Sequence, residues 1–176
     1  MSQSTNLYMI SKLDFEEFSK NPESYNLVFD DCNSSVFDQN FEGLYFLFSS
    51  FYKDQLPEFL EKLFYPKDYI GEAIDYGTID FDDFDALPES KAIYYLDSLT
   101  VKEIAKALKT IKKEALLEFY NADKFNANDV YPHAWHNDES ENQAFNKRHL
   151  KEGLELLEKT FTNANIEDNY ILFFSA

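Results

Sequence analysis

Apolar, strand-like segments near both ends of the chain constrain the fold more than any other feature. Residues 6–10 and 169–175 are short apolar runs, and the second is apolar throughout its centre, which is typical of a strand inside a sheet. A third run covers residues 91–96. Strands so far apart in the sequence can pair only through long-range contacts. Because helical patterns lie between them, we predict an α+β fold, with a small, mostly antiparallel sheet packed by several helices.

Helical periodicity covers much of the remaining chain. The clearest case is residues 100–115, where apolar side chains recur at three- and four-residue spacing and Thr100 with Glu103 forms a capping box. Further helices are expected around residues 14–18 and at residues 37–52, 58–64, 114–120 and 140–162, with a weaker strand at 69–74. No internal repeat and no linker rich in Gly, Ser or Pro interrupts this order. We therefore expect one domain over residues 1–176.

The composition predicts an aromatic interior beneath an acidic surface. Aromatic residues make up 18% of the chain, and 33 acidic against 16 basic side chains give a net charge of −17. Such a surface repels nucleic-acid phosphates and anionic lipids, and it accelerates encounter with basic partners. The simpler explanation is that the charge keeps a Phe-rich protein soluble. Neither a nucleic acid nor a membrane is expected as a partner.

The N-terminal residues and the apolar runs indicate in which cellular compartment the protein is expected. No apolar stretch approaches the ~20 residues that a membrane helix needs, and no signal segment opens the chain. A single cysteine, Cys32, cannot form an internal disulfide. We therefore expect a cytoplasmic protein.

Residues 125–136 are the most informative segment for function. They hold the only tryptophan, Trp135, with His133, His136 and the pair Tyr131-Pro132, and they show neither helical nor alternating periodicity. Irregular backbone that carries such large side chains usually packs into something or binds something. We expect residues 130–136 of this segment, together with the acidic surface, to form the binding surface of the protein.

A tyrosine-rich pocket is the second candidate site. Pockets that combine large rings with a few polar groups bind small molecules. The residues that we expect to line such a pocket or to bind a ligand or partner are Tyr45, Glu72, Tyr94, Tyr95, Tyr131, His133 and Trp135. In an enzyme, Glu72 or His133 would serve as the acid or base. Core packing also explains each tyrosine individually, so both interpretations stay open.

Metal and cofactor motifs are weak or missing. The acidic loop at residues 80–85 lacks the glycine and the closing glutamate of an EF-hand, and His133 with His136 lacks an identifiable third strong ligand. There is no Gly-rich phosphate loop, no Gly-x-Ser-x-Gly elbow and no cysteine pair. We therefore predict no metal and no cofactor.

Several sequence blocks, taken in order, are similar to a known family. The blocks are residues 7–18, 43–48, 92–105 and 126–135. Together they resemble the YfbM-like family of bacterial proteins of unknown function, over nearly the whole chain. That resemblance implies a compact α+β domain without an agreed activity, so it transfers no catalytic residue. The family usually has Trp two residues before a Gly-Leu pair and His after it, whereas this chain has Phe41 and Tyr45 there, which weakens an enzymatic interpretation.

Two functions of different kinds follow from the sequence. The first is a non-enzymatic binding or interaction protein, and its specific form is an immunity-type antagonist that captures a basic toxin through electrostatic attraction. The alternative is a small-molecule enzyme or sensor that uses the tyrosine-rich pocket.

Overall fold

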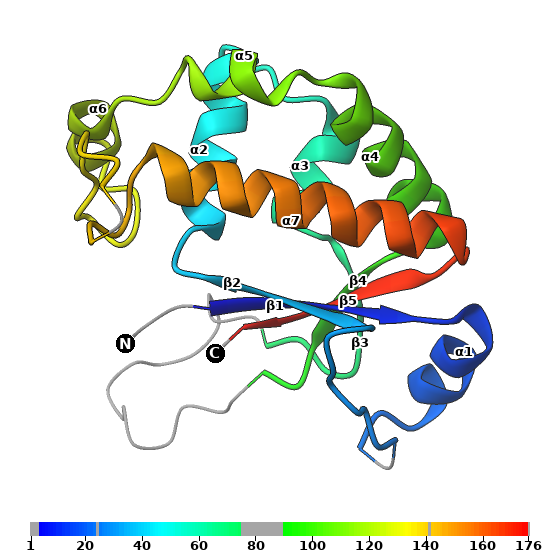
Figure 1. Cartoon of the computed structure of the whole chain (residues 1–176). Helices are drawn as coiled ribbons and strands as arrows, with labels where there is room; N and C mark the ends of the chain where they lie inside the picture. Colours follow the sequence, from blue (N-terminus) through cyan, green and yellow to red (C-terminus); the bar gives the residue numbers. More distant parts are fainter. Residues whose placement is uncertain (1–3, 24, 75–89, 141, 176) are drawn as a thin grey trace, which may run out of the picture.

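The fold is an open sheet with most of the helices on one face (Figure 1). The computed structural model describes residues 4–23, 25–74, 90–140 and 142–175. Its strands are β1 (Ser4–Ile10), β2 (Ser34–Asp38), β3 (Asp68–Ile70), β4 (Ile93–Leu96) and β5 (Tyr170–Ser175). They form a five-stranded sheet in the order β2-β1-β5-β4-β3, and every neighbouring pair is antiparallel. The α+β prediction is confirmed.

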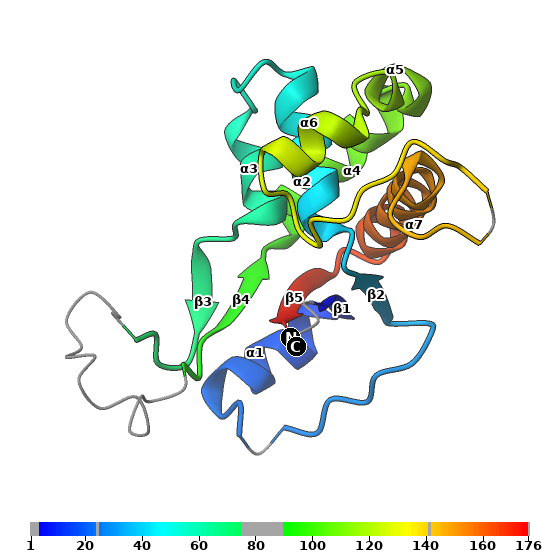
Figure 2. The same cartoon turned by 90° about the vertical axis from the view of Figure 1, so that its left-hand side faces the viewer.

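The helices are distributed unequally over the two faces of the sheet. On one face lie α2 (Phe41–Phe51), α3 (Glu58–Phe64), α4 (Ser98–Thr110), α5 (Lys113–Leu117), α6 (Ala122–Ala127) and α7 (Lys147–Ile166). On the opposite face lies α1 (Lys12–Lys20), which Figure 2 shows beneath the strands. Among the described residues, no helix combines the length and the apolar character needed to cross a membrane.

Alternation along the central strands divides the interior into two cores. Leu7 and Met9 of β1 face the large core under α2–α7, whereas Tyr8 and Ile10 face the small core under α1. The neighbouring strand β5 divides its side chains in the same way. Because both faces of these strands are covered, residues 7–10 of β1 and 170–174 of β5 are apolar or aromatic without interruption, as the sequence predicted for the centre of residues 169–175.

The chain forms β2 where a helix over residues 37–52 was predicted. Phe37 is paired with Thr5 of β1 and is almost fully buried, although its spacing from Phe41 suggested a helix. The strand ends at Asp38. Gln39, with a φ of 57°, then turns the chain, and Asn40 precedes the first residue of α2. That helix prediction is therefore wrong for its first four positions, because pairing with β1 outweighs a helical spacing of aromatic residues.

Caps decide where two other helices begin. At α4 the side chain of Asp97 accepts the Thr100 N–H at 2.7 Å, so Asp97, and not Thr100, is the N-cap. The predicted helix from residue 140 begins only at Lys147. The fully buried Asn146 accepts the His149 N–H at 3.2 Å, and its amide donates to the Asp138 carbonyl at 2.8 Å, which holds the preceding residues in a loop.

Other predicted boundaries were closer to the structure. Helix α3 has the predicted bounds, and residues 93–96 and 170–175 are strands as expected. β3 is shorter than the predicted 69–74, and α6 extends over residues 125–127, which were expected to be irregular. The acidic loop at residues 80–85 lies outside the described residues.

Candidate functional site

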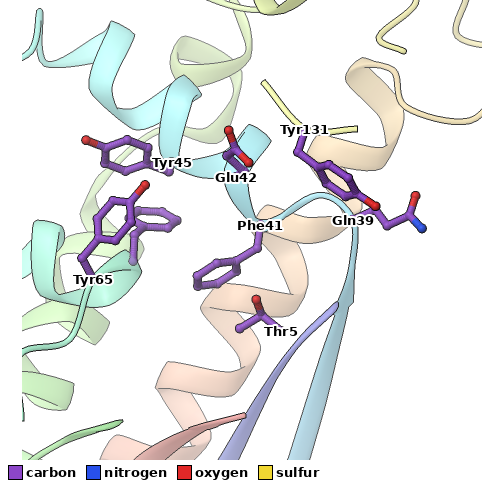
Figure 3. Close-up of a pocket in the computed structure, with 8 residues that line it drawn as sticks. Thr5, Gln39, Phe41, Glu42, Tyr45, Tyr65 and Tyr131 are labelled. Carbon is purple, nitrogen blue, oxygen red and sulfur yellow. The ribbon is translucent and has the colours of Figure 1, made fainter. Parts of the chain in front are cut away.

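A hollow lies where the start of α2, the end of α3 and the loop after α6 meet (Figure 3). Its volume is about 170 Å³. It is lined by Thr5, Gln39, Phe41, Glu42, Tyr45, Phe64, Tyr65 and Tyr131. Figure 3 shows Tyr45 and Tyr65 on one side and Tyr131 with Gln39 on the other, with the Glu42 carboxylate between the two groups.

The N-terminal end of α2 supplies the centre of the hollow. Leu44, Leu47 and Phe48 turn into the core, which leaves Phe41, Glu42 and Tyr45 on the flank of the helix. Glu42 lies in the first turn, where the helix dipole favours a negative charge.

Edge-to-face contacts between rings hold one wall of the hollow. The Phe64 ring lies 5.2 Å from that of Phe41 and 5.5 Å from that of Tyr45, and the Tyr45 ring lies 4.8 Å from that of Tyr65. Phe64 also contacts the core residue Phe48 at 5.6 Å. Such contacts each add about 0.5–1.5 kcal/mol beyond burial, so the wall is fixed to the core before any ligand arrives.

Among the described residues, Glu42 is the only carboxylate that lines the hollow. It is exposed, and within the described part of the chain it forms no ion pair. Burial, followed by the neighbouring Tyr45 and Glu42, raises the pKa of Tyr65. The Tyr65 hydroxyl is therefore neutral at physiological pH. One negative charge among neutral rings and oxygen atoms suits a cationic group, through both charge pairing and cation–π contact.

The hollow continues into a larger one beside the sheet. This adjoining hollow has a volume of about 640 Å³ and shares Thr5, Phe41, Phe64 and Tyr65 with the first. Tyr94, on the large-core face of β4, lines it. The two hollows thus bring the predicted residues Tyr45, Tyr94 and Tyr131 into one region.

Glu72 and His133 lie outside both hollows. Glu72 is exposed just after β3, and its carbonyl accepts the Lys91 N–H at 3.2 Å. His133 is exposed, and its ring lies 5.9 Å from that of Tyr131, so it borders the small hollow without lining it. Among the residues that the structure covers, no group of three or more His, Cys, Asp or Glu could hold a metal ion.

Trp135 does not line the hollow, which corrects the expectation for this residue. It is only 2% exposed and packs over Gly43, with the Phe125 ring 4.9 Å away. Its indole N–H donates to the Val130 carbonyl at 2.9 Å. An indole that can satisfy its one donor locally gains more from burial than from exposure at a binding surface. Trp135 is a core side chain.

Tyr95 is likewise separated from the pocket. Adjacent residues of a strand point to opposite faces, so Tyr94 faces the large core and Tyr95 faces α1. The Tyr95 ring lies 4.7 Å from that of Phe15. The expectation that both tyrosines line one pocket is therefore corrected.

Residues 128–136, the loop after α6, hold Tyr131 in a fixed position. The Asn126 side chain accepts the Trp135 N–H at 2.9 Å and donates to the Trp135 carbonyl at 3.0 Å. The Tyr120 hydroxyl donates to the His136 carbonyl at 2.6 Å, and burial raises the pKa of Tyr120 to about 12. These bonds fix both ends of the turn that presents Tyr131.

Sequence reasoning missed Gln39, Glu42 and Tyr65 as site residues. Gln39 and Glu42 lie around the start of α2 and Tyr65 follows α3, and nothing in their local sequence marks them. The positive φ of Gln39 is the one unusual local feature, because a non-glycine residue in this region is uncommon and such residues cluster at binding sites.

The sequence of residues 1–174 matches the family described as Domain of unknown function (DUF1877). The chain belongs to the DUF1877 family. Its fold is similar to the crystal structure of YfbM from Escherichia coli, a protein of unknown function, with a TM-score of 0.62, 11% identity and 100% of both chains covered. At this identity the likeness shows the fold alone. No curated protein matches the sequence.

The resemblance to the YfbM-like family is thus confirmed. In this DUF1877 protein, Phe41 and Tyr45, the two positions at which we expected a departure from the family pattern, both line the small hollow.

Proposed function

We propose that this protein is a non-enzymatic binding protein of the bacterial cytoplasm that captures a basic partner protein. The observation that carries the proposal is the exposed Glu42 carboxylate, which forms no ion pair with any described residue, inside a ring-lined hollow of a protein with a net charge of −17. The overall charge attracts a cationic partner from a distance and accelerates encounter. The hollow then supplies the specific contact.

The size of the small hollow favours a protein side chain over a metabolite. A cavity of roughly 150 Å³ holds one benzene molecule, whereas pockets for drug-sized ligands measure about 300–1,000 Å³. At about 170 Å³ the hollow fits the end of a single side chain. A cation placed over an aromatic ring gains roughly 0.5–2 kcal/mol, and a charged hydrogen bond to Glu42 adds to it.

The specific form of the proposal is an immunity-type antagonist of a basic toxin. Its test is co-expression with the basic products of neighbouring genes. We expect this protein to relieve the toxicity of one of them and to form a complex whose affinity falls as salt rises from about 50 mM to about 500 mM, because screening weakens the attraction. Absence of both rescue and complex at low salt would contradict the proposal.

A second candidate function is a small-molecule sensor or enzyme that uses the adjoining hollow. Its volume of about 640 Å³ lies within the range of small-molecule sites, and Tyr94 is available there. A ligand of this hollow would raise the melting temperature, and Tyr94→Phe would reduce that rise. A broad metabolite screen that shifts the melting temperature for no compound would remove this candidate.

A further inference from the structure

We infer that the small hollow seats an arginine side chain. The inference rests on the proposed capture of a basic partner and names the group by which that partner is recognised. It comes from the acceptors that line the hollow, from the rings that flank it and from the charge on Glu42.

The acceptors of the hollow match a guanidinium better than an ammonium. Arginine presents five N–H donors in a planar fork, whereas lysine presents three on a compact, strongly hydrated ammonium. Polar residues that line the hollow are Thr5, Gln39, Glu42, Tyr45, Tyr65 and Tyr131. Among the described residues, no lysine or arginine lines it. The Glu42 carboxylate can accept two parallel N–H groups of a guanidinium through its two oxygens, which favours arginine.

The rings favour a flat cation. Tyr45 and Tyr65 meet at an interplanar angle of 85°, so the wall offers both a ring face and a ring edge. Tyr131 lies across the hollow from them (Figure 3). A guanidinium stacks on ring faces and is less strongly hydrated than an ammonium. It therefore loses less hydration free energy when it enters such a hollow. Tyr65 is 52% exposed and is accessible to an incoming side chain.

The charge of Glu42 is available to a ligand. Lys62 of the adjacent helix α3 lies 3.5 Å from Glu58 and pairs with it along the helix. Within the described chain no cation pairs with Glu42. A negative charge at the start of α2 is also stabilised by the helix dipole.

The test compares three short peptides that differ at one position: arginine, lysine or citrulline. Citrulline has nearly the shape of arginine but no charge. We would titrate each into the full-length protein at low salt and follow the amide resonances by NMR. We expect arginine to bind about tenfold or more tightly than lysine, and citrulline to bind more weakly still, because hydrogen bonds to charged groups are the stronger ones.

Matched variants identify the site. Glu42→Gln should lower the affinity for the arginine peptide at least about tenfold. The control is Glu155→Gln, the same change at an exposed residue of α7 outside the hollow, which should leave this affinity unchanged. Tyr65→Ala should weaken binding, and Tyr65→Phe, which keeps the ring, should weaken it less. These two variants test the hollow independently of Glu42.

The outcomes separate this inference from the proposed function. Equal binding of arginine and lysine, with both lost in Glu42→Gln, would overturn the arginine seat and leave capture of a basic partner in place. Arginine binding that survives both Glu42→Gln and Tyr65→Ala would place the contact elsewhere and overturn the inference too. If no peptide binds while a basic protein still forms a complex, the seat is wrong and the proposed function stands; if neither binds, both fail.

Discussion

The indole of Trp135 lies directly against the backbone of Gly43, in the first turns of α2. A Cβ placed on Gly43 would come within 2.4 Å of Trp135 Cη2 and 2.5 Å of Cζ2, closer than real atoms approach. The glycine thus lets the loop after α6 close onto α2. That contact keeps Tyr131 opposite Tyr45 across the small hollow.

Gly43→Ala should destabilise the protein by about 1–3 kcal/mol in chemical denaturation, because the rigid indole cannot yield without disturbing its neighbours. Gly153→Ala in α7 is the matched control. Its Cβ would lie 2.9 Å from the amide of Asn40, which can move aside more easily, and alanine is the better helix former by up to about 1 kcal/mol. An equal loss of unfolding free energy in the two variants would contradict the explanation that the rigid indole is what excludes a side chain at Gly43.

Asn146→Ala should cost about 2–3 kcal/mol, more than an ordinary helix cap. The substitution removes the N-cap of α7 and also the amide that donates to the carbonyls of Asp138 and Gln143. Urea unfolding gives the magnitude. Hydrogen exchange should show faster exchange at the start of α7, and protection there equal to the wild type would refute the capping role.

Tyr120 should make stability depend on pH in the alkaline range. Its pKa is raised to about 12 in the folded state from an ordinary value of 10.0. The contribution of its hydroxyl to the free energy of unfolding is therefore complete below pH 10 and is lost as pH rises towards 12. At pH 8, Tyr120→Phe should cost about 1 kcal/mol through the lost hydrogen bond to His136. Urea midpoints measured from pH 8 to about pH 11.5 should show this difference shrinking. A difference between wild type and Tyr120→Phe that stays constant over this pH range would contradict the raised pKa of Tyr120.

Substitution of the two adjacent tyrosines of β4 should have different effects. Tyr95→Ala removes a ring from the cluster that holds α1, where Phe15 stacks on Tyr170 at 4.4 Å, and should cost about 1–3 kcal/mol. Limited proteolysis should then cut near α1. Tyr94→Ala affects a residue that is 39% exposed, and α1 should stay protected. Cleavage near α1 in both variants would show that the faces are not independent.

Local patterns were sufficient for elements whose ends are marked in the sequence. Residues 58–64 follow Pro57 and precede Tyr65-Pro66, and α3 has those bounds. β2 was missed because only Phe37 among its residues is buried, so it carries no strand pattern of its own. It exists because β1 offers an open edge. Only the tertiary structure supplies that information.

The candidate site could be predicted only in part. Tyr45 and Tyr131 were named because tyrosines are common in binding sites, and both line the hollow. Glu42 and Tyr65 were not, since their proximity depends on how the ends of α2 and α3 meet. Trp135 was misjudged for a physical reason: its donor finds the Val130 carbonyl five residues away, and sequence alone does not show such a bond.

The two central strands of the sheet come from opposite ends of the described chain, and Thr5 lies opposite Ser175. During synthesis, β1 must therefore wait until residues 170–175 emerge before its partner β5 exists. Until then the edge of β1 that pairs with β5 stays open to other proteins in the cell. The acidic character of the polypeptide then has a use before folding is complete, because mutual repulsion keeps unfinished copies apart.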